Sequence, residues 1–278
     1  MSAPPTSSPP LDLVAVLRGA GCVFAEDEAR LLLSSAATPA ELAAMVERRV
    51  SGVPLEHVVG WAAFCGLRIA VDPGVFVPRP RTEFLVEQAV ALAAAAWAPV
   101  GSPDRPPIVV DLCCGTGAVG AALVAALAPE LGAVELHATD IDPAAVRCAR
   151  RNVAATGQVY EGDLYAALPS SLRGRVDLVV ANAPYVPTEA VALLPAEARV
   201  HEPLVSLDGG SDGLDVLRRV VSGAPAWLAP GGHLLVETSE HQSPGLAATL
   251  VSSGLIPRIA SSGELFATVV IGTRPLRA

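Results

Sequence analysis

Lysine is absent from this chain of 278 residues, so all 19 residues counted as lysine or arginine are arginines. This absence excludes a phosphate-binding loop that ends in Gly-Lys-Ser/Thr, a Schiff-base lysine and a pyridoxal phosphate anchor. Positive charge is also outnumbered, because 28 acidic residues give a net charge of -9. Proteins that bind nucleic acid by neutralising phosphates usually carry the opposite balance. We therefore expect no direct nucleic-acid partner.

Cysteine is sparse, and its spacing argues against the common metal sites. The five cysteines form no Cys-x-x-Cys pair and show no metal-ligand spacing with the five scattered histidines. An odd number of cysteines is typical of reduced thiols. The sequence therefore predicts no bound metal and a cytoplasmic location.

Long apolar runs are missing as well. The longest, residues 89–100, is about half the length that a membrane-spanning helix needs, so we expect no membrane partner. Residues 1–10 are rich in proline and serine and lack the basic and apolar regions of a signal peptide. We expect them to form a disordered tail.

Hydrophobic residues make up 51% of the chain, enough to bury a sizeable core. Apolar residues follow helical spacing between positions 11 and 50, and residues 65–77 alternate like a hairpin that turns at a Pro-Gly pair. We predict a helical N-terminal domain over 11–64, a β-hairpin connector over 65–81 and a larger domain over 82–278.

The larger domain begins with a predicted helix over 82–97 and a linker rich in glycine and proline over 99–107. Strands and helices then alternate. Apolar runs typical of strands occupy 108–112, 134–139, 176–181 and 232–236, and helical stretches lie near 117–127, 143–155 and 213–228. This alternation predicts an α/β fold with a mostly parallel sheet and helices on both of its faces. Two extended runs, 255–260 and 265–272, predict a final antiparallel hairpin.

A glycine-rich turn follows the first of these strands. Gly115 to Gly120 has the form Gly-x-Gly-x-x-Gly, and Asp140 lies 20 residues beyond it at the next strand end. Such a turn lets a ligand approach the backbone and the free N–H groups of a helix start. By itself this pattern favours NAD and other nucleoside cofactors equally.

Asp111 favours one of those cofactors. It lies four residues before the first glycine of the turn, where its carboxylate would repel the pyrophosphate of a dinucleotide. A positively charged amino group suits this position, as in S-adenosylmethionine. Asp140 would then bind the ribose hydroxyls, and Asp163, after the following strand, would bind the adenine edge.

The residues after the strand at 176–181 suit transfer to a planar NH2 group. The lone pair of such a nitrogen is delocalised, so it attacks a sulfonium methyl group poorly. If the Asn182 side-chain oxygen and the Ala183 carbonyl accepted its two N–H bonds, they would fix its plane and concentrate electron density on nitrogen. Pro184 restricts Ala183 to an extended conformation, and Tyr185 supplies an aromatic wall.

With these residues the chain resembles the HemK-type protein-(glutamine-N(5)) methyltransferases, which are class I S-adenosylmethionine-dependent enzymes. The family tetrapeptide Asn-Pro-Pro-Tyr stands here as Asn182-Ala183-Pro184-Tyr185. The segment from Phe76 to Glu83 is similar to the family's Pro-Arg-Pro-Glu-Thr-Glu segment. The stretch from His201 to Asp215 matches the family as well.

The resemblance implies a Rossmann-like catalytic domain that binds S-adenosyl-L-methionine, with a helical N-terminal domain that grips a protein partner. It implies cofactor contacts from Cys113, Cys114, Gly115, Thr116, Gly117, Asp140, Leu164 and Asn182. It also implies that residues 182–185 hold the substrate glutamine and that Phe76 and Thr82 help to close the cofactor pocket. A peptide chain release factor is the first candidate for the partner.

Departures from the family pattern concern the substrate more than the reaction. Ala183 replaces the first proline of the tetrapeptide, and Arg81 stands where the family usually has glutamate. The altered tetrapeptide is similar to a branch of the family whose substrate is unassigned. Three alternatives remain: an adenine amino-methyltransferase of nucleic acid, a non-catalytic protein that binds S-adenosylmethionine, and a dehydrogenase.

Overall fold

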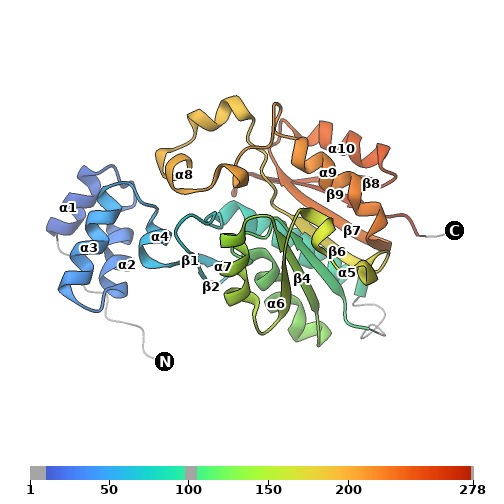
Figure 1. Cartoon of the computed structure of the whole chain (residues 1–278), viewed down its shortest axis with the longest axis horizontal. Helices are drawn as coiled ribbons and strands as arrows, with labels where there is room; N and C mark the ends of the chain where they lie inside the picture. The colour runs from blue at the N-terminus through green and yellow to red at the C-terminus, as the bar shows by residue number, and fades with distance from the viewer. Residues whose placement is uncertain (1–10, 98–104, 277–278) are drawn as a thin grey trace.

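The computed structural model describes residues 11–97 and 105–276 of the chain. Its N-terminal part is a small group of helices, blue in Figure 1, that stands beside the larger part containing the main sheet. These helices are α1 (Leu11–Gly19), α2 (Ala25–Ser35), α3 (Pro39–Val50) and α4 (Leu55–Val59). They enclose an apolar core of their own. The expected tail over 1–10 and most of the expected linker over 99–107 lie outside the described residues.

The predicted β-hairpin is present, but its position was wrong. Strand β1 (Trp61–Phe64) pairs antiparallel with β2 (Leu67–Ala70), so the hairpin precedes the Pro-Gly pair at 73–74. The chain turns at Cys65 and Gly66, whose φ angles are 47° and 74°. Two positive φ angles are what a two-residue turn between twisted strands requires. Of the connector predicted over 65–81, only its first residues belong to the hairpin.

The main sheet has seven strands in the order β5-β4-β3-β6-β7-β9-β8. The strands are β3 (Ile108–Leu112), β4 (Glu135–Asp140), β5 (Gly157–Glu161), β6 (Val176–Ala181), β7 (Leu228–Thr238), β8 (Ile256–Ser262) and β9 (Ala267–Thr273). Strands β3 to β7 are parallel, whereas β9 pairs antiparallel with both β7 and β8. The predicted mostly parallel sheet with a final hairpin is confirmed.

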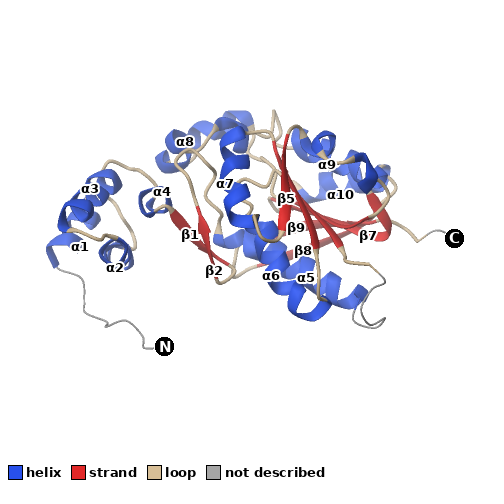
Figure 2. Cartoon of the chain, turned by 60° about the horizontal axis from the view of Figure 1, so that its bottom comes forward, coloured by secondary structure: helices blue, strands red, loops and turns tan. Residues whose placement is uncertain are grey.

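Helices cover both faces of this sheet (Figure 2). They are α5 (Glu83–Trp97), α6 (Ala118–Leu131), α7 (Pro143–Val153), α9 (Asp215–Gly223) and α10 (Ser243–Ser252), and the chain has one further helix, α8 (Ala196–His201), among the described residues of this part. Residues of α5 and α6 belong to one apolar core against the sheet, and residues of α9 and α10 belong to the other. Helix α8 lies in the long segment between β6 and β7. None of the helices in the described ranges is long and apolar enough to cross a membrane.

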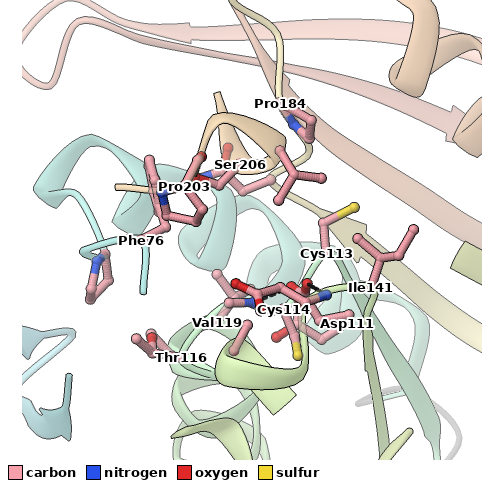
Figure 3. Close-up of a pocket in the computed structure, with 18 of the residues that line it drawn as sticks. Phe76, Asp111, Cys113, Cys114, Thr116, Val119, Ile141, Pro184, Pro203 and Ser206 are labelled. Atoms are coloured by element: carbon pink, nitrogen blue, oxygen red, sulfur yellow. Dashed lines mark hydrogen bonds between the residues drawn. The ribbon is translucent and has the colours of Figure 1, made fainter. Parts of the chain in front are cut away.

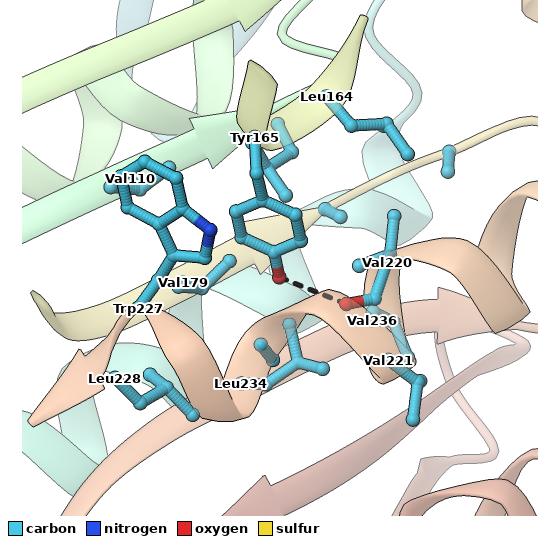
Figure 4. Close-up of a cluster of buried hydrophobic side chains, with 14 of the residues drawn as sticks. Val110, Leu164, Tyr165, Val179, Val220, Val221, Trp227, Leu228, Leu234 and Val236 are labelled. Atoms are coloured by element: carbon cyan, nitrogen blue, oxygen red, sulfur yellow. Dashed lines mark hydrogen bonds between the residues drawn. The ribbon is translucent and has the colours of Figure 1, made fainter. Parts of the chain in front are cut away.

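The core on the α9 side contains a stacked aromatic pair (Figure 4). Tyr165 stacks on Trp227 with ring centroids 5.8 Å apart, and both side chains are buried. The Tyr165 hydroxyl donates to the Val220 carbonyl at 2.9 Å. A buried tyrosine needs such a partner, because an unpaired hydroxyl in an apolar core is costly. This contact fixes the segment after β5 against α9.

Candidate active site

Three neighbouring strands bring the predicted polar residues to one edge of the sheet. In the parallel register, Leu112 of β3 lies between Thr139 of β4 and Ala181 of β6. Asp111, Asp140 and Asn182 therefore come to the same carboxyl edge, where ligands of open α/β sheets bind. All three line one pocket.

The glycine-rich turn forms the floor of this pocket. Cys113, Cys114 and Thr116 line it (Figure 3), together with Gly115; the cofactor contacts that the resemblance implied for them stay predictions. Gly117 has a φ of 76°, and a Cβ there would lie 3.2 Å from the Ala149 side chain of α7. Glycine at this position lets the turn pack closely on α7 and begin α6 in a left-handed conformation. Gly117 packs against α7 and does not line the pocket.

Asp140 ties the turn to the end of β4. Its Oδ2 accepts the Gly115 N–H at 2.8 Å, and its Oδ1 accepts the Asp142 N–H at 2.9 Å. Each oxygen of a carboxylate can accept a second hydrogen bond, so both can still receive ribose hydroxyls. Burial raises the pKa of Asp140, while the two N–H donors act in the opposite direction. The remaining acceptor capacity of the Asp140 carboxylate suits the hydroxyls of the ribose in the expected cofactor.

Asp111 is the most deeply buried acid of the pocket. Its side chain is fully enclosed, and its Oδ2 accepts the Gly120 N–H at 2.9 Å. Burial raises its pKa to about 7, with the negative charge of Asp140 adding to this effect. A buried carboxylate with one hydrogen bond gains strongly from a nearby cation. The site therefore fits an amino group, as the sequence predicted, and not a phosphate.

Asn182 lies where this pocket meets a second one. Its Nδ2 donates to the buried hydroxyl of Thr82 at 3.2 Å. This contact orients the amide so that Oδ1 remains to accept a hydrogen bond from a bound NH2 group. Thr82 and Phe76 both line the first pocket, where the resemblance placed them.

The second pocket is on the far side of Asn182 and is lined by the rest of the tetrapeptide. Ala183, Pro184 and Tyr185 border it, together with Arg81 and four residues in and before α8: Leu194, Pro195, Glu197 and Ala198. The Tyr185 hydroxyl donates to Glu237 Oε1 at 2.9 Å, and Glu237 is buried. The two pockets share Asn182 and Pro184, so a group in one can face a group in the other.

Sequence reasoning missed one wall of the site. Pro203, Val205 and Ser206, in the segment between β6 and β7, close the first pocket opposite the glycine-rich turn (Figure 3). Glu202 holds this wall, because it accepts the N–H of Val77 at 3.1 Å and pairs with Arg79 at 2.6 Å. The only signal in the sequence was that 201–215 matched the family.

Besides Gly117, two predicted cofactor contacts are not in the pocket lining. Asp163 is half-exposed and pairs with Arg219, and Leu164 is buried in the core beside α9 with a φ of 47°. Both follow β5, at the edge of the sheet next to Asp140. The expected contacts of Asp163 with the adenine edge and of Gly117 and Leu164 with the cofactor stay predictions.

Comparisons with known proteins agree with this geometry. A family model described as "Methyltransferase small domain" matches residues 102–203. A release factor glutamine methyltransferase of Mycolicibacterium smegmatis is 38% identical over 86% of this chain and 82% of its own. One of Geobacter sulfurreducens is 39% identical over 72% of this chain and 66% of its own. A 4-amino-L-phenylalanine/4-methylamino-L-phenylalanine methyltransferase of Streptomyces pristinaespiralis is 38% identical over 75% of this chain and 69% of its own.

Solved structures show the same fold at low sequence identity. A 16S rRNA N2 G1207 methyltransferase of T. thermophilus, in complex with AdoMet and guanosine, is 22% identical and has a TM-score of 0.52 over 77% of this chain and 49% of its own. A methyltransferase of Pyrococcus furiosus is 14% identical, with a TM-score of 0.52 over 83% of this chain and 98% of its own. The fold is that of class I methyltransferases.

Proposed function

The chain belongs to the HemK-type family of protein-(glutamine-N(5)) methyltransferases, and we propose that its acceptor is a glutamine of a peptide chain release factor. It is an S-adenosylmethionine-dependent enzyme that methylates a glutamine side-chain amide. The observation that carries the proposed acceptor is the position of Asn182, between a cofactor pocket and a second pocket open to a side chain.

Asn182 and Ala183 would bind the acceptor amide directly. The cofactor, when bound, supplies a methyl group on a positively charged sulfur. The Asn182 Oδ1 and the Ala183 carbonyl accept the two N–H bonds of the glutamine NH2 group, which holds its nitrogen toward the cofactor pocket. Thr82 supports this arrangement, because its contact with Nδ2 keeps the oxygen of Asn182 turned to the acceptor.

Tyr185 would form the wall on which the planar amide rests. Its ring borders the second pocket, and its hydroxyl is held by Glu237. After transfer the amide nitrogen is strongly acidic and loses a proton to water, so no dedicated base is required. We place the reaction in the cytoplasm, where translation takes place. The five cysteines, all free, suit a reducing compartment.

The test uses a release factor purified from cells that lack this protein. With labelled S-adenosylmethionine, we expect one methyl group on one glutamine, located by mass spectrometry of peptides. Asn182→Ala should lower turnover by a factor of at least about 10² while the fold is retained, since the residue contacts the reacting group. Label on other proteins only would exclude the release factor as acceptor. An unchanged rate in Asn182→Ala would exclude the proposed binding of the amide by Asn182.

A second acceptor is favoured by one relative. The Streptomyces pristinaespiralis relative is named for 4-amino-L-phenylalanine, whose NH2 group is also planar and conjugated. Tyr185 could stack on an aromatic ring as well as on an amide. The free amino acid, offered with labelled cofactor, should become labelled on its aromatic nitrogen if the enzyme also accepts it.

A further inference from the structure

Three charged side chains line the second pocket: Arg79, Arg81 and Glu197. Arg79 donates through Nη2 to both oxygens of the buried Glu202, and Glu197 pairs with Arg49, each at 2.6 Å. Arg81 is held by a longer contact. Only its Nε has a partner among the described residues, Glu237 Oε1 at 3.1 Å, and its side chain is 46% exposed.

Arg81 is held at its base and open at its tip. Glu237 anchors the Nε edge, and the guanidinium carbon lies 5.9 Å from the centre of the Tyr185 ring. The two terminal nitrogens carry four N–H donors, and the hydrogen bonds among the described residues use none of them, although the nearby Tyr185 hydroxyl also acts on the guanidinium. A guanidinium fixed in this way is prepared to receive a second acceptor at little cost in side-chain entropy.

Two other arginines of this chain show that one guanidinium can bind two carboxylates at once. Arg49 contacts Glu28 through Nε and Nη2 while its Nη1 contacts Glu197 at 2.6 Å. Arg218 likewise lies between Asp212 and Asp215. In both cases one guanidinium serves two carboxylates. Arg81 has the first carboxylate of such a set, Glu237, and it lines the pocket in which the methyl acceptor would lie.

We propose that the acceptor substrate carries a carboxylate, and that Arg81 binds it through its terminal nitrogens while Asn182 holds the NH2 group. The inference rests on the proposed site of methyl transfer at Asn182. A carboxylate matches the planar fork of arginine with two parallel hydrogen bonds. Two sources offer this chemistry: an acidic side chain next to the target glutamine, and the α-carboxylate of a free amino acid.

The experiment compares acceptors that differ only in a carboxylate. One set consists of glutamine peptides with aspartate or asparagine at each flanking position, and the other of 4-amino-L-phenylalanine and its carboxamide. For the wild type, we expect KM to be about tenfold lower for the carboxylate member of at least one pair. Arg81→Gln should abolish this difference, Arg81→Lys should keep part of it, and Arg81→Glu should reverse it. The readout is the ratio of the two KM values within each pair, because Arg81→Gln also removes a partner of Glu237, which holds Tyr185.

Arg68→Gln is the matched control, because Arg68 is exposed and lies on the Trp61 ring in the β1–β2 hairpin, outside both pockets. It should behave as the wild type. The proposal fails if the wild type shows no preference for a carboxylate with any pair, or if Arg81→Gln keeps the preference. Methylation of the release factor without a preference for a carboxylate would contradict the proposed role of Arg81 but not the proposed release-factor substrate. A preference seen only with the free amino acid would support carboxylate binding by Arg81 and exclude the release factor as the source of that carboxylate.

Discussion

At the scale of single residues, the chemistry of the site depends on how strongly burial changes a carboxyl group. Asp111 and Asp140 both lie at strand ends in one pocket, but only Asp111 is completely enclosed. Burial raises the pKa of Asp111 to about 7, so in the absence of ligand it is half-protonated near neutral pH. Below about pH 7, binding of a cation beside Asp111 must therefore release the proton of its carboxyl group.

We predict that the affinity for S-adenosylmethionine rises with pH up to about 7 and then levels off. Below its pKa, Asp111 must lose its proton to pair with the amino group, which weakens binding about tenfold per pH unit. Above about pH 8 the α-amino group itself loses its charge. Isothermal titration calorimetry in buffers of different ionisation enthalpy measures both the affinity and the proton released. A constant affinity between about pH 5.5 and 7 would contradict this assignment.

Asp111→Asn provides the control for that titration. It should weaken cofactor binding and remove most of the pH dependence, while any part due to Asp140 would persist. Without cofactor the variant should also be more stable than the wild type at pH 8. The folded-state pKa of Asp111 lies above the ordinary value of 3.8, so its contribution to stability is present below that value and is lost as pH rises through about 7. Thermal unfolding at two pH values measures this difference.

At the scale of elements, local turn chemistry decides where the β1–β2 hairpin lies. The alternating pattern over 65–77 predicted a turn at Pro73-Gly74, but the chain turns eight residues earlier. Cys65 and Gly66 both have positive φ angles there, which the sequence does not announce because cysteine is uncommon in this conformation. The Cys65 N–H is held by the Glu83 carboxylate of α5 at 2.8 Å, a contact 18 residues away.

Gly66→Ala should lower the free energy of unfolding by about 1 kcal/mol, because alanine is strained at a φ of 74°. The loss would come from backbone strain alone, since a Cβ at this position meets nothing within 4 Å. Gly263→Ala is the matched control: it too has open space around it, and its φ is not in the left-handed range. Urea unfolding of both variants compares them, and equal losses would argue against strain as the cause.

At the scale of the whole molecule, a buried arginine links the helical N-terminal part to the substrate side of the site. Arg49 of α3 pairs with Glu28 of α2 and also contacts Glu197 of α8 at 2.6 Å. Glu197 borders the second pocket. Helix α8 therefore depends for its position on a part of the chain almost 150 residues away.

Glu197→Gln should raise KM for a protein acceptor by about three- to tenfold and leave kcat nearly unchanged. It removes the charge that holds α8 to Arg49, yet the fold should survive because Glu197 is half-exposed and Arg49 keeps Glu28. Glu189→Gln, an exposed change in the same segment, is the control and should leave KM unchanged. Steady-state kinetics with the release factor measure both variants. A fall in kcat without a change in KM would contradict a positioning role for α8.

The sequence by itself determined most of the sheet, its final hairpin and the polar residues that meet at its carboxyl edge. Strands 108–112 and 176–181 were predicted with the bounds that the structure has, because buried parallel strands are continuous apolar runs between turn residues. Asp111, Asp140 and Asn182 follow from the same pattern, since parallel strands end at one edge. The sequence failed to predict α10, whose small apolar residues lack a clear polar face.

Only the tertiary structure decided which residues act together on the substrate side. Arg81 meets Glu237 across 156 positions, Asn182 meets Thr82 across 100, and Glu202 meets Val77 across 125. Periodicity and spacing describe one element at a time, so they carry no information on such pairs. The pairs form because burial leaves each polar group only the partners that packing brings within reach, and an unpaired group there would be costly.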